Sequence, residues 1–197
     1  MIRGFHLVWT AYGWWFPNDP RGSWSSWVGS WDLYRYGPAT KVNTTQSLAH
    51  QPHDRQKRLN AKEVLKYPPV RFTGIQARAI GTGFARAIQE HGFKYLACAI
   101  MPDHVHVVLS PHGMNPGQAL GKLKRLAGDA LVDQNLHPMQ RFARKNARPP
   151  LCFARRGWKV YLDTPDAVMR SIHYVEQNPV KEGLPLQRWQ FVEKPRF

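Results

Sequence analysis

Residues 101–109, MPDHVHVVL, constrain the fold of this chain more than any other segment. The run is apolar and rich in valine, as in a buried strand, yet it carries His104 and His106 one residue apart. Because side chains alternate along a strand, both imidazoles point to one face of a sheet, while Val105 and Val107 point to the other. The segment therefore predicts a strand with one packed face and one face that bears half of a metal site.

The residues before this histidine pair favour a β-hairpin. An apolar strand is expected at 95–101, followed by a tight turn at Pro102 and Asp103 and a second strand at 104–110. A His-X-His pair on its own is a short motif that also arises by chance. On a hairpin it faces outward from the packed core, which suits a catalytic metal better than a buried core histidine.

A second motif lies near the C-terminus and predicts a helix at 165–178. Thr164 is a suitable N-cap, and Pro165 fits the first helical position. Pro179, followed by Gly183, is expected to end the element. The sequence therefore favours a helix of about four turns in this region.

Tyr174 and Asn178 share a face of that helix, because they are four residues apart. The neighbouring apolar stripe is formed by Val168, Ile172 and Val175, which places Tyr174 near the boundary between core and solvent. A phenol there is both held and exposed, as a nucleophile requires, although a helical tyrosine is more often a packing residue.

The two motifs together resemble those of the single-tyrosine HUH transposases. The order is an apolar strand ending in MPDHVH, a basic helix, and a late YVEQNPVKEGL. The closing segment is most similar to that of the REP-associated tyrosine transposases. The resemblance covers about residues 74–184, with a weaker echo at 4–22, and its motifs are jointly specific because they occur in the same order and separation.

The resemblance implies roles for individual residues. His104 and His106 would be the metal-binding pair, Tyr174 the nucleophile and Asn178 the third metal ligand. Gln177 precedes Asn178 and many relatives have glutamine at the ligand position, so either amide could reach the metal, and the i+4 spacing favours Asn178. The implied reaction is cleavage of single-stranded DNA through a 5′-phosphotyrosine intermediate, with rejoining by the reverse reaction, at hairpins from repetitive extragenic palindromes.

The expected ligands also suit the chemistry of phosphate transfer. Two neutral imidazoles and a neutral amide leave a divalent cation its full charge, with which to polarise a scissile phosphate. Oxygen ligands favour Mg²⁺ or Mn²⁺, while the histidines also allow Mn²⁺, Co²⁺ or adventitious Zn²⁺. A phenol with an ordinary pKa near 10 needs activation, and His173 and Lys181 are close to Tyr174 in the sequence.

The charge of the chain indicates a polyanionic partner. It has 28 Lys and Arg against 13 Asp and Glu, a net charge of +15. Residues 113–160 hold ten of these cations and two acidic residues, and leucines at 120, 123, 126 and 131 predict a helix at 117–134 with its cations toward solvent. A solvated charged face is the alternative for each cation. The candidate DNA-binding residues are Lys122, Lys124, Arg125, Arg155, Arg156 and Trp158.

Aromatic residues are concentrated between positions 14 and 36. Five tryptophans lie in this stretch, more than the packing of a loop requires. We expect some of them to stack on unpaired DNA bases, and the alternative is a satellite cluster packed over the sheet. The residues are Trp14, Trp15, Phe16, Trp24, Trp27, Trp31, Tyr34 and Tyr36.

The expected architecture is a single α+β domain over 1–197, because the length is near the usual domain size and no low-complexity linker divides the chain. Strands are predicted at 4–12 and 158–163 besides the hairpin, and a further helix at 74–91. An antiparallel sheet with helices packed on one face would leave the other face free for DNA and metal. The resemblance implies the same ferredoxin-like, HUH endonuclease-like sheet, and 17–72 is expected to be an irregular N-terminal insertion.

The remaining features limit the environment of the protein. Cys98 and Cys152 suggest neither a disulfide framework nor a zinc site, and no apolar run is long enough to span a membrane. A bacterial cytoplasmic location at the nucleoid is expected, with single-stranded hairpin DNA as partner and a monomer or homodimer as the assembly. A non-catalytic DNA-hairpin-binding protein and a hydrolytic metal-dependent nuclease are the alternative functions.

Overall fold

The structure is a computed structural model, and it describes residues 1–44, 48–49 and 51–193. The chain divides into two compact units, one made of Met1–Ala11 with Arg71–Phe197 and the other of Tyr12–Val70. The second unit overlaps the stretch 17–72. That this stretch is an insertion within a single domain stays a prediction.

A four-stranded antiparallel sheet forms the centre of the first unit, with the strand order β2-β3-β1-β4. The expected hairpin is present: the amide of Met101 donates to the carbonyl of His104 across the turn at 2.8 Å. The mixed fold with an antiparallel sheet is therefore confirmed. The strands are β1 (Gly4–Thr10), β2 (Tyr95–Ile100), β3 (His104–Leu109) and β4 (Trp158–Leu162).

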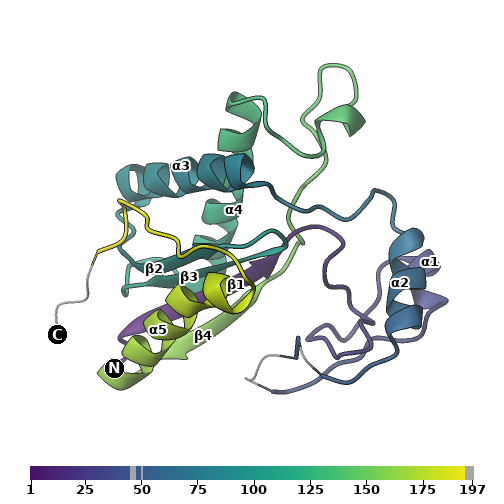
Figure 1. Cartoon of the computed structure of the whole chain (residues 1–197), viewed down its shortest axis with the longest axis horizontal. Helices are drawn as coiled ribbons and strands as arrows, with labels where there is room; N and C mark the ends of the chain where they lie inside the picture. Colours follow the sequence, from purple (N-terminus) through teal and green to yellow (C-terminus); the bar gives the residue numbers. More distant parts are fainter. Residues whose placement is uncertain (45–47, 50, 194–197) are drawn as a thin grey trace. The chain divides into compact units, whose positions relative to one another are not determined.

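Two long helices, α3 (Gly74–His91) and α4 (Pro116–Asp133), lie on one side of the sheet (Figure 1). Both begin with a capping box, in which the N-cap side chain and the residue three positions later satisfy each other's backbone amides. They meet at Gly83, where an added Cβ would lie 2.5 Å from the carbonyl oxygen of Leu126. A side chain at this position would force the helices apart.

This side of the sheet is closed by large apolar residues. Trp9 and Phe84 are almost completely buried and meet edge to face, with ring centroids 5.8 Å apart. Val105 and Val107 point to the same side and are fully buried. The expected alternation along the histidine strand is thus confirmed for its apolar half.

Helix α5 (Pro165–Lys181) lies against the opposite side of the sheet, which corrects the expectation that all helices pack on one face (Figure 1). The apolar stripe of the helix needs a partner, and it finds one in a second core on the histidine side. That core includes Val108, Leu162, Val168, Ile172 and Val175.

The same helix runs further than expected, because Pro179 lies inside it and Lys181 is its last residue. The N-cap is as predicted: the hydroxyl of Thr164 accepts from the amide of Ala167 at 3.1 Å. Beyond the helix, Gly183 has a φ of +71°, a left-handed conformation that suits glycine. The proline therefore shapes the last turn but does not end the helix.

The unit formed by Tyr12–Val70 has its own small core. It contains the short helices α1 (Trp31–Tyr34) and α2 (Arg55–Glu63), and its buried cluster is Phe16, Val28, Leu33 and Ala61. A buried ion pair joins Arg21 to Asp19 at 2.8 Å. The N-terminal segment is thus more ordered than its sequence suggested.

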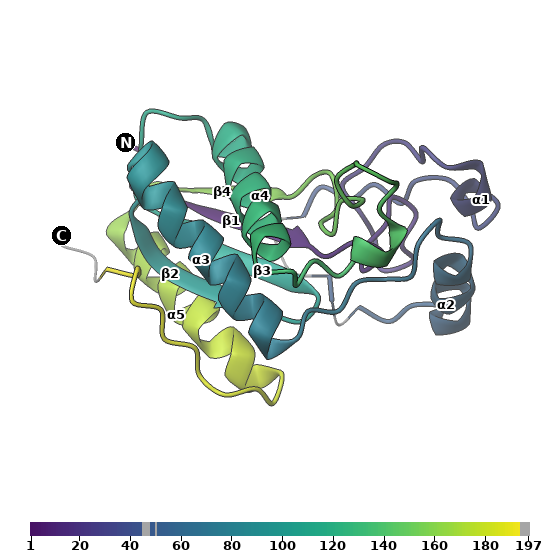
Figure 2. The same cartoon turned by 90° about the horizontal axis from the view of Figure 1, so that it is seen from above.

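Among the described residues, no helix is long and apolar enough to cross a membrane. Cys98 and Cys152 are both buried and free of disulfides. A 3₁₀ turn at Gln140–Phe142 lies between α4 and β4, and Figure 2 shows α3 and α4 side by side from above.

Candidate active site

The site is built around His106, which lies on β3 and faces α5. It is 5% exposed, and it is not alone there: His6 on β1 points to the same side of the sheet. The Nε2 atom of His6 lies 3.0 Å from Nδ1 of His106, so one imidazole hydrogen-bonds the other. This contact leaves Nε2 of His106 directed toward the helix.

His104 lies beside His106, with ring centroids 4.8 Å apart. Its Nδ1 atom is 2.5 Å from Oδ1 of Asp103, the turn residue of the hairpin. Metal-bound histidines usually have their second ring nitrogen paired with a carboxylate, a carbonyl or another polar group, which fixes the ring and its tautomer. In both His104 and His106, Nδ1 is paired in this way.

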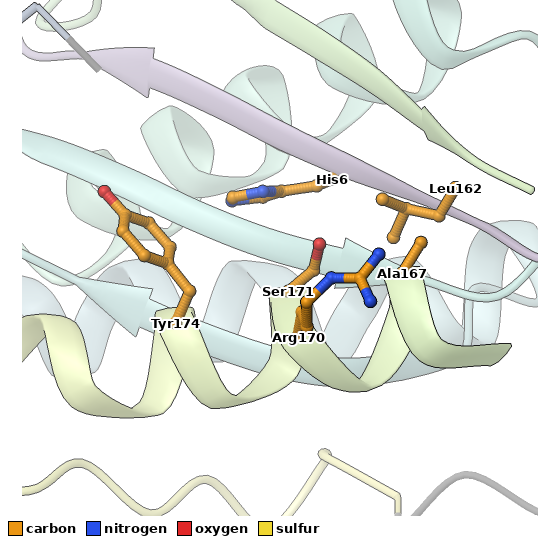
Figure 3. A pocket seen from close by; sticks show the side chains of 6 residues that line it. All are labelled: His6, Leu162, Ala167, Arg170, Ser171 and Tyr174. Atoms are coloured by element: carbon orange, nitrogen blue, oxygen red, sulfur yellow. The ribbon is translucent and has the colours of Figure 1, made fainter. Parts of the chain in front are cut away.

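Helix α5 brings Tyr174 and Asn178 to the histidines. The Nδ2 atom of Asn178 lies 3.3 Å from Nε2 of His106. The ring centroid of Tyr174 is 5.5 Å from that of His106 and 6.0 Å from that of His6. Figure 3 shows Tyr174 on the helix opposite His6. Asn178 is buried and Tyr174 is 37% exposed, so the amide is held while the phenol can still meet a partner from solvent.

The structure gives the positions of the neighbouring residues that the sequence singled out. Gln177 is half-buried, whereas Asn178 makes the contact with His106. His173 is exposed, but Nζ of Lys181 lies 5.4 Å from the centre of the Tyr174 ring. Of the two groups near the tyrosine in sequence, the lysine is thus the one placed against its ring.

Burial determines the charge state of the imidazoles. It lowers the pKa of His6 to about 4. The pKa of His106 lies well below its ordinary value, first because of burial and then because of His104 and His6. Both rings are therefore neutral at neutral pH, the form in which an imidazole nitrogen binds a metal.

Tyr174 is in the opposite situation, since burial raises the pKa of its phenol. A hydrogen bond with the side chain of Asn178 opposes this shift, and the charge of Glu182 adds to it. The phenol is therefore protonated at neutral pH. A reaction that uses it as a nucleophile must remove this proton.

The residues present fit a divalent metal ion. Nδ1 of His104 and Nδ1 of His106 are each engaged by a protein partner, while Nε2 of His106 faces the amide nitrogen of Asn178. If that amide is turned over, it presents its oxygen as a ligand on the same side. Within the described part of the chain, no cluster of three His, Cys, Asp or Glu side chains is arranged to hold a metal. The candidate ligand set is two imidazoles and a carboxamide, because His104 lies beside His106 and Asn178 contacts it.

Lys124 does not face solvent, which corrects the prediction from the sequence. Its ammonium donates to the carbonyls of Ala154 and Arg156 at 2.7 and 2.8 Å, and burial, assisted by Lys159, lowers its pKa to about 8. The expectation that it faces solvent was wrong because it lies on the same helical face as the buried Leu120. Lys124 ties α4 to the segment before β4.

The other predicted DNA-binding residues are more accessible. Lys122, Arg155 and Arg156 are exposed. Arg125 is exposed but pairs with Glu90 at 3.1 Å and with Asp129 at 3.0 Å. These positions leave the DNA-binding role of each residue a prediction.

Trp158 shares its face of the sheet with the histidines. It is half-buried on β4, directly opposite Val8 of β1, and Val8 is in turn opposite His106. Two strand spacings, on the order of 10 Å, therefore separate Trp158 from His106 across the sheet. An aromatic side chain thus lies in the same row as the candidate metal ligand.

The aromatic residues of the 12–70 unit fall into two groups. Trp14 and Trp15 lie under cations: Nζ of Lys62 is 4.4 Å from the Trp14 ring, and the guanidinium of Arg21 is 3.7 Å from the Trp15 ring. By contrast, Trp27 and Trp31 are 72% and 84% exposed. Packing accounts for the first group, and base stacking by the second stays a prediction.

His6 was missed by the sequence analysis. The signal was present, since a histidine interrupts the apolar strand GFHLVWT. What the sequence could not supply was the strand order, which makes β1 the neighbour of β3 and brings together residues 100 positions apart. Only that pairing turns an isolated histidine into a partner of His106.

No protein-family model matches this chain, and no curated protein matches it. Among solved structures, it is similar to that of a REP-associated tyrosine transposase bound to a REP hairpin. The identity is 11%, the TM-score is 0.48, and the match covers 93% of this chain and 70% of the other. The function of this chain therefore has to be inferred from its own residues.

Proposed function

We propose that this chain is a metal-dependent single-stranded DNA endonuclease of the transposase type, which cleaves and rejoins DNA through a tyrosine-linked intermediate. The observation that carries the proposal is the convergence of Tyr174, Asn178 and His106. These residues come from two distant segments, and they meet within contact distance on one side of the sheet. A packing tyrosine has no need of a neutral imidazole pair and a buried amide beside it.

In the proposed step, the phenolic oxygen of Tyr174 attacks the phosphorus of a DNA phosphodiester. The new bond joins that oxygen to phosphorus, and the bond from phosphorus to the 3′ oxygen breaks, leaving a 5′-phosphotyrosine and a strand with a free 3′-hydroxyl. The phenolic proton leaves the tyrosine, and the 3′ oxygen gains one. Because one phosphodiester replaces another, the reverse reaction rejoins the strand without an external energy source.

His104, His106 and Asn178 would hold Mg²⁺ or Mn²⁺ in this proposal. Such an ion, when bound, polarises a phosphate and stabilises the charge that develops on its oxygens. Asp103 and His6 hold the two metal-binding imidazoles through their Nδ1 atoms. Asn178 has a second role, since its hydrogen bond with Tyr174 opposes the rise in the phenol's pKa.

Two further features support DNA as the substrate. The chain carries a net charge of +15, which attracts a phosphate backbone. The exposed Lys122, Arg155 and Arg156 can contact phosphates, and the row that contains His106 also contains Trp158. Hairpin-containing sites of the REP type are the proposed targets.

The test is formation of a covalent adduct. Wild type and Tyr174→Phe are incubated with end-labelled hairpin DNA that carries single-stranded flanks, in Mn²⁺ or Mg²⁺, and run on a denaturing gel. We expect a protein-linked band with wild type that requires metal and is absent with Tyr174→Phe. The matched control is Tyr161→Phe, an exposed tyrosine on β4 that packs against Phe5 and not against the histidines, and it should form the adduct normally.

Two other results would overturn the proposal. Free cleavage products from both wild type and Tyr174→Phe would indicate a hydrolytic nuclease, in which water attacks the phosphate. Binding without cleavage by the metal-loaded wild type, across a broad library of hairpins, would indicate a DNA-binding protein without catalysis.

A further inference from the structure

A cavity of about 390 Å³ opens beside Tyr174, between α5 and the end of β4. Its walls are the aromatic or polar side chains of His6, Tyr174 and Ser171, the apolar side chains of Leu162 and Ala167, and the cation of Arg170. In Figure 3 the guanidinium of Arg170 extends toward Ala167 and Leu162, at the end of the cavity away from Tyr174. The cavity thus has a nucleophile at one end and a cation at the other.

Arg170 makes no ion pair with a carboxylate in the part of the chain that the structure describes. The residue is exposed. This contrasts with Arg21, Arg86, Arg125 and Arg148, all of which pair with aspartate or glutamate. An unpaired guanidinium that lines a cavity can bind an anion with two parallel hydrogen bonds.

The spacing along α5 relates this cation to the nucleophile. Arg170 precedes Tyr174 by four residues, one helical turn, or on the order of 6 Å along the axis. Lys181 lies on the other side of Tyr174, with its ammonium 5.4 Å from the tyrosine ring. Tyr174 therefore lies between two cations of the same helix, each of which can contact a phosphate.

We propose that this cavity holds the nucleotide next to the scissile phosphate, with the guanidinium of Arg170 on the phosphate adjacent to the one that Tyr174 attacks. The inference rests on the proposed function, because it takes single-stranded DNA as the substrate. Leu162 and Ala167 provide the apolar surface against which the sugar or base packs, and Ser171 supplies a hydroxyl for hydrogen bonding. Arg170 is thus a substrate-binding residue that reads the backbone and not the base sequence.

The experiment is a double-mutant cycle between Arg170 and single DNA phosphates. The probe is a hairpin oligonucleotide with short thymidine flanks, in which one flank phosphate at a time is replaced by a neutral methylphosphonate. Affinities are measured in Mn²⁺ for Tyr174→Phe, which cannot cleave, with and without Arg170→Gln. We expect Arg170→Gln to weaken binding about tenfold and to reduce the salt slope by about 0.7, the value for one phosphate contact on a single strand.

The cycle locates the contact. One methylphosphonate, next to the cleavage position, should weaken binding about tenfold when Arg170 is present and less than about twofold in Arg170→Gln. Arg170→Lys keeps the charge and should retain sensitivity to the same phosphate. The matched control is Arg78→Gln, which removes one exposed cation from α3 on the opposite side of the sheet, and it should leave the phosphate scan unchanged.

The outcomes separate this inference from the proposed function. If the covalent adduct forms but Arg170→Gln behaves like Arg78→Gln, the cavity does not bind a nucleotide and only this inference is wrong. If Arg170 is coupled to one phosphate but no adduct ever forms, the cavity binds DNA and the tyrosine chemistry is wrong. Equal sensitivity to every methylphosphonate in both proteins would also overturn the inference.

Discussion

The two sides of the sheet are built from the same strands, but one is an apolar core and the other holds the candidate active site. On one side, Trp9, Val105 and Val107 pack beneath α3 and α4 in an entirely apolar layer. On the other, the same strands present His6 and His106 to α5. Strands β1 and β3 thus turn apolar side chains to one side of the sheet and a histidine to the other.

On the histidine side, hydrogen bonds offset the free-energy cost of burying polar side chains. Burial of two imidazoles and an amide is unfavourable unless they hydrogen-bond, and here they bond to one another. The apolar core of α5, centred on Val168 and Val175, holds the helix in place around them. The layer beneath α3 and α4 is apolar and has no such cost. We therefore expect this side to contribute most of the free energy of unfolding.

The largest expected effect tests that division of roles. Phe84→Ala removes a fully buried ring that contacts Trp9 and Tyr95, and we expect it to lower the free energy of unfolding by about 3–5 kcal/mol. Tyr174→Phe, on the other side, should change stability by less than about 1 kcal/mol, since its ring is retained. Both are measured by urea denaturation without metal.

The comparison would fail if the two variants were equally stable, or if Tyr174→Phe were the more damaging. In either case the histidine side would be the main source of stability, and its polar groups would be structural. If the proposed metal site is correct, a Phe84→Ala protein that stays folded should bind Mn²⁺ as wild type does, because Phe84 packs against Trp9 on the opposite side of the sheet from His106.

The expected elements were predicted well, because strong local signals defined them. The helix at 74–91 matches α3 at both ends, and the bounds of the other predicted strands and helices differ by one to three residues. The short helices α1 and α2 were not predicted, since they lie in the stretch expected to be irregular. Capping residues such as Thr73 and Asn115, and the alternation in β3, are local patterns that need no tertiary information. The antiparallel sheet followed from the hairpin and its neighbours.

What could not be predicted depends on the three-dimensional arrangement. The side of the sheet that α5 covers is set by packing between segments far apart in the chain, so the sequence placed the helix with α3 and α4. Lys124 was misplaced for a related reason: its aliphatic stem lies along a buried stripe, and only the tertiary fold supplies the carbonyls that accept its protons. His6 required the pairing of β1 with β3.

A second prediction concerns the dependence of stability on pH. Burial holds the pKa of His6 at about 4 in the folded state, against 6.5 for an unperturbed histidine. The unfolded state therefore binds more protons between these values, so His6 makes stability fall as the pH drops from about 6.5 to 4. The loss is about 3 kcal/mol from this group.

The measurement compares wild type with His6→Gln in metal-free buffer across this pH range. Glutamine can still hydrogen-bond Nδ1 of His106 but does not titrate, so the difference in unfolding free energy between the two proteins should change by about 3 kcal/mol between pH 6.5 and 4. His137, whose pKa is also lowered to about 4, is present in both and cancels. Parallel pH profiles would mean that His6 is not buried in its neutral form.

The smallest expected effect concerns two neighbouring amides on α5, Gln177 and Asn178. It tests which of the two contacts the histidines. Asn178→Ala removes the buried contact with Nε2 of His106, which we expect to cost about 1 kcal/mol of stability and to weaken Mn²⁺ binding, measured by titration. Gln177→Ala is the matched control. The Gln177 side chain is half-buried and is the residue before Asn178, so it lies on a different face of the helix, and the free energy of unfolding should change by less than about 0.5 kcal/mol. The contrary outcome is that Gln177→Ala weakens Mn²⁺ binding and Asn178→Ala does not. In that case Gln177 would be the third ligand. Helix α5 would then have to rotate about its axis for the Gln177 amide to reach the histidines.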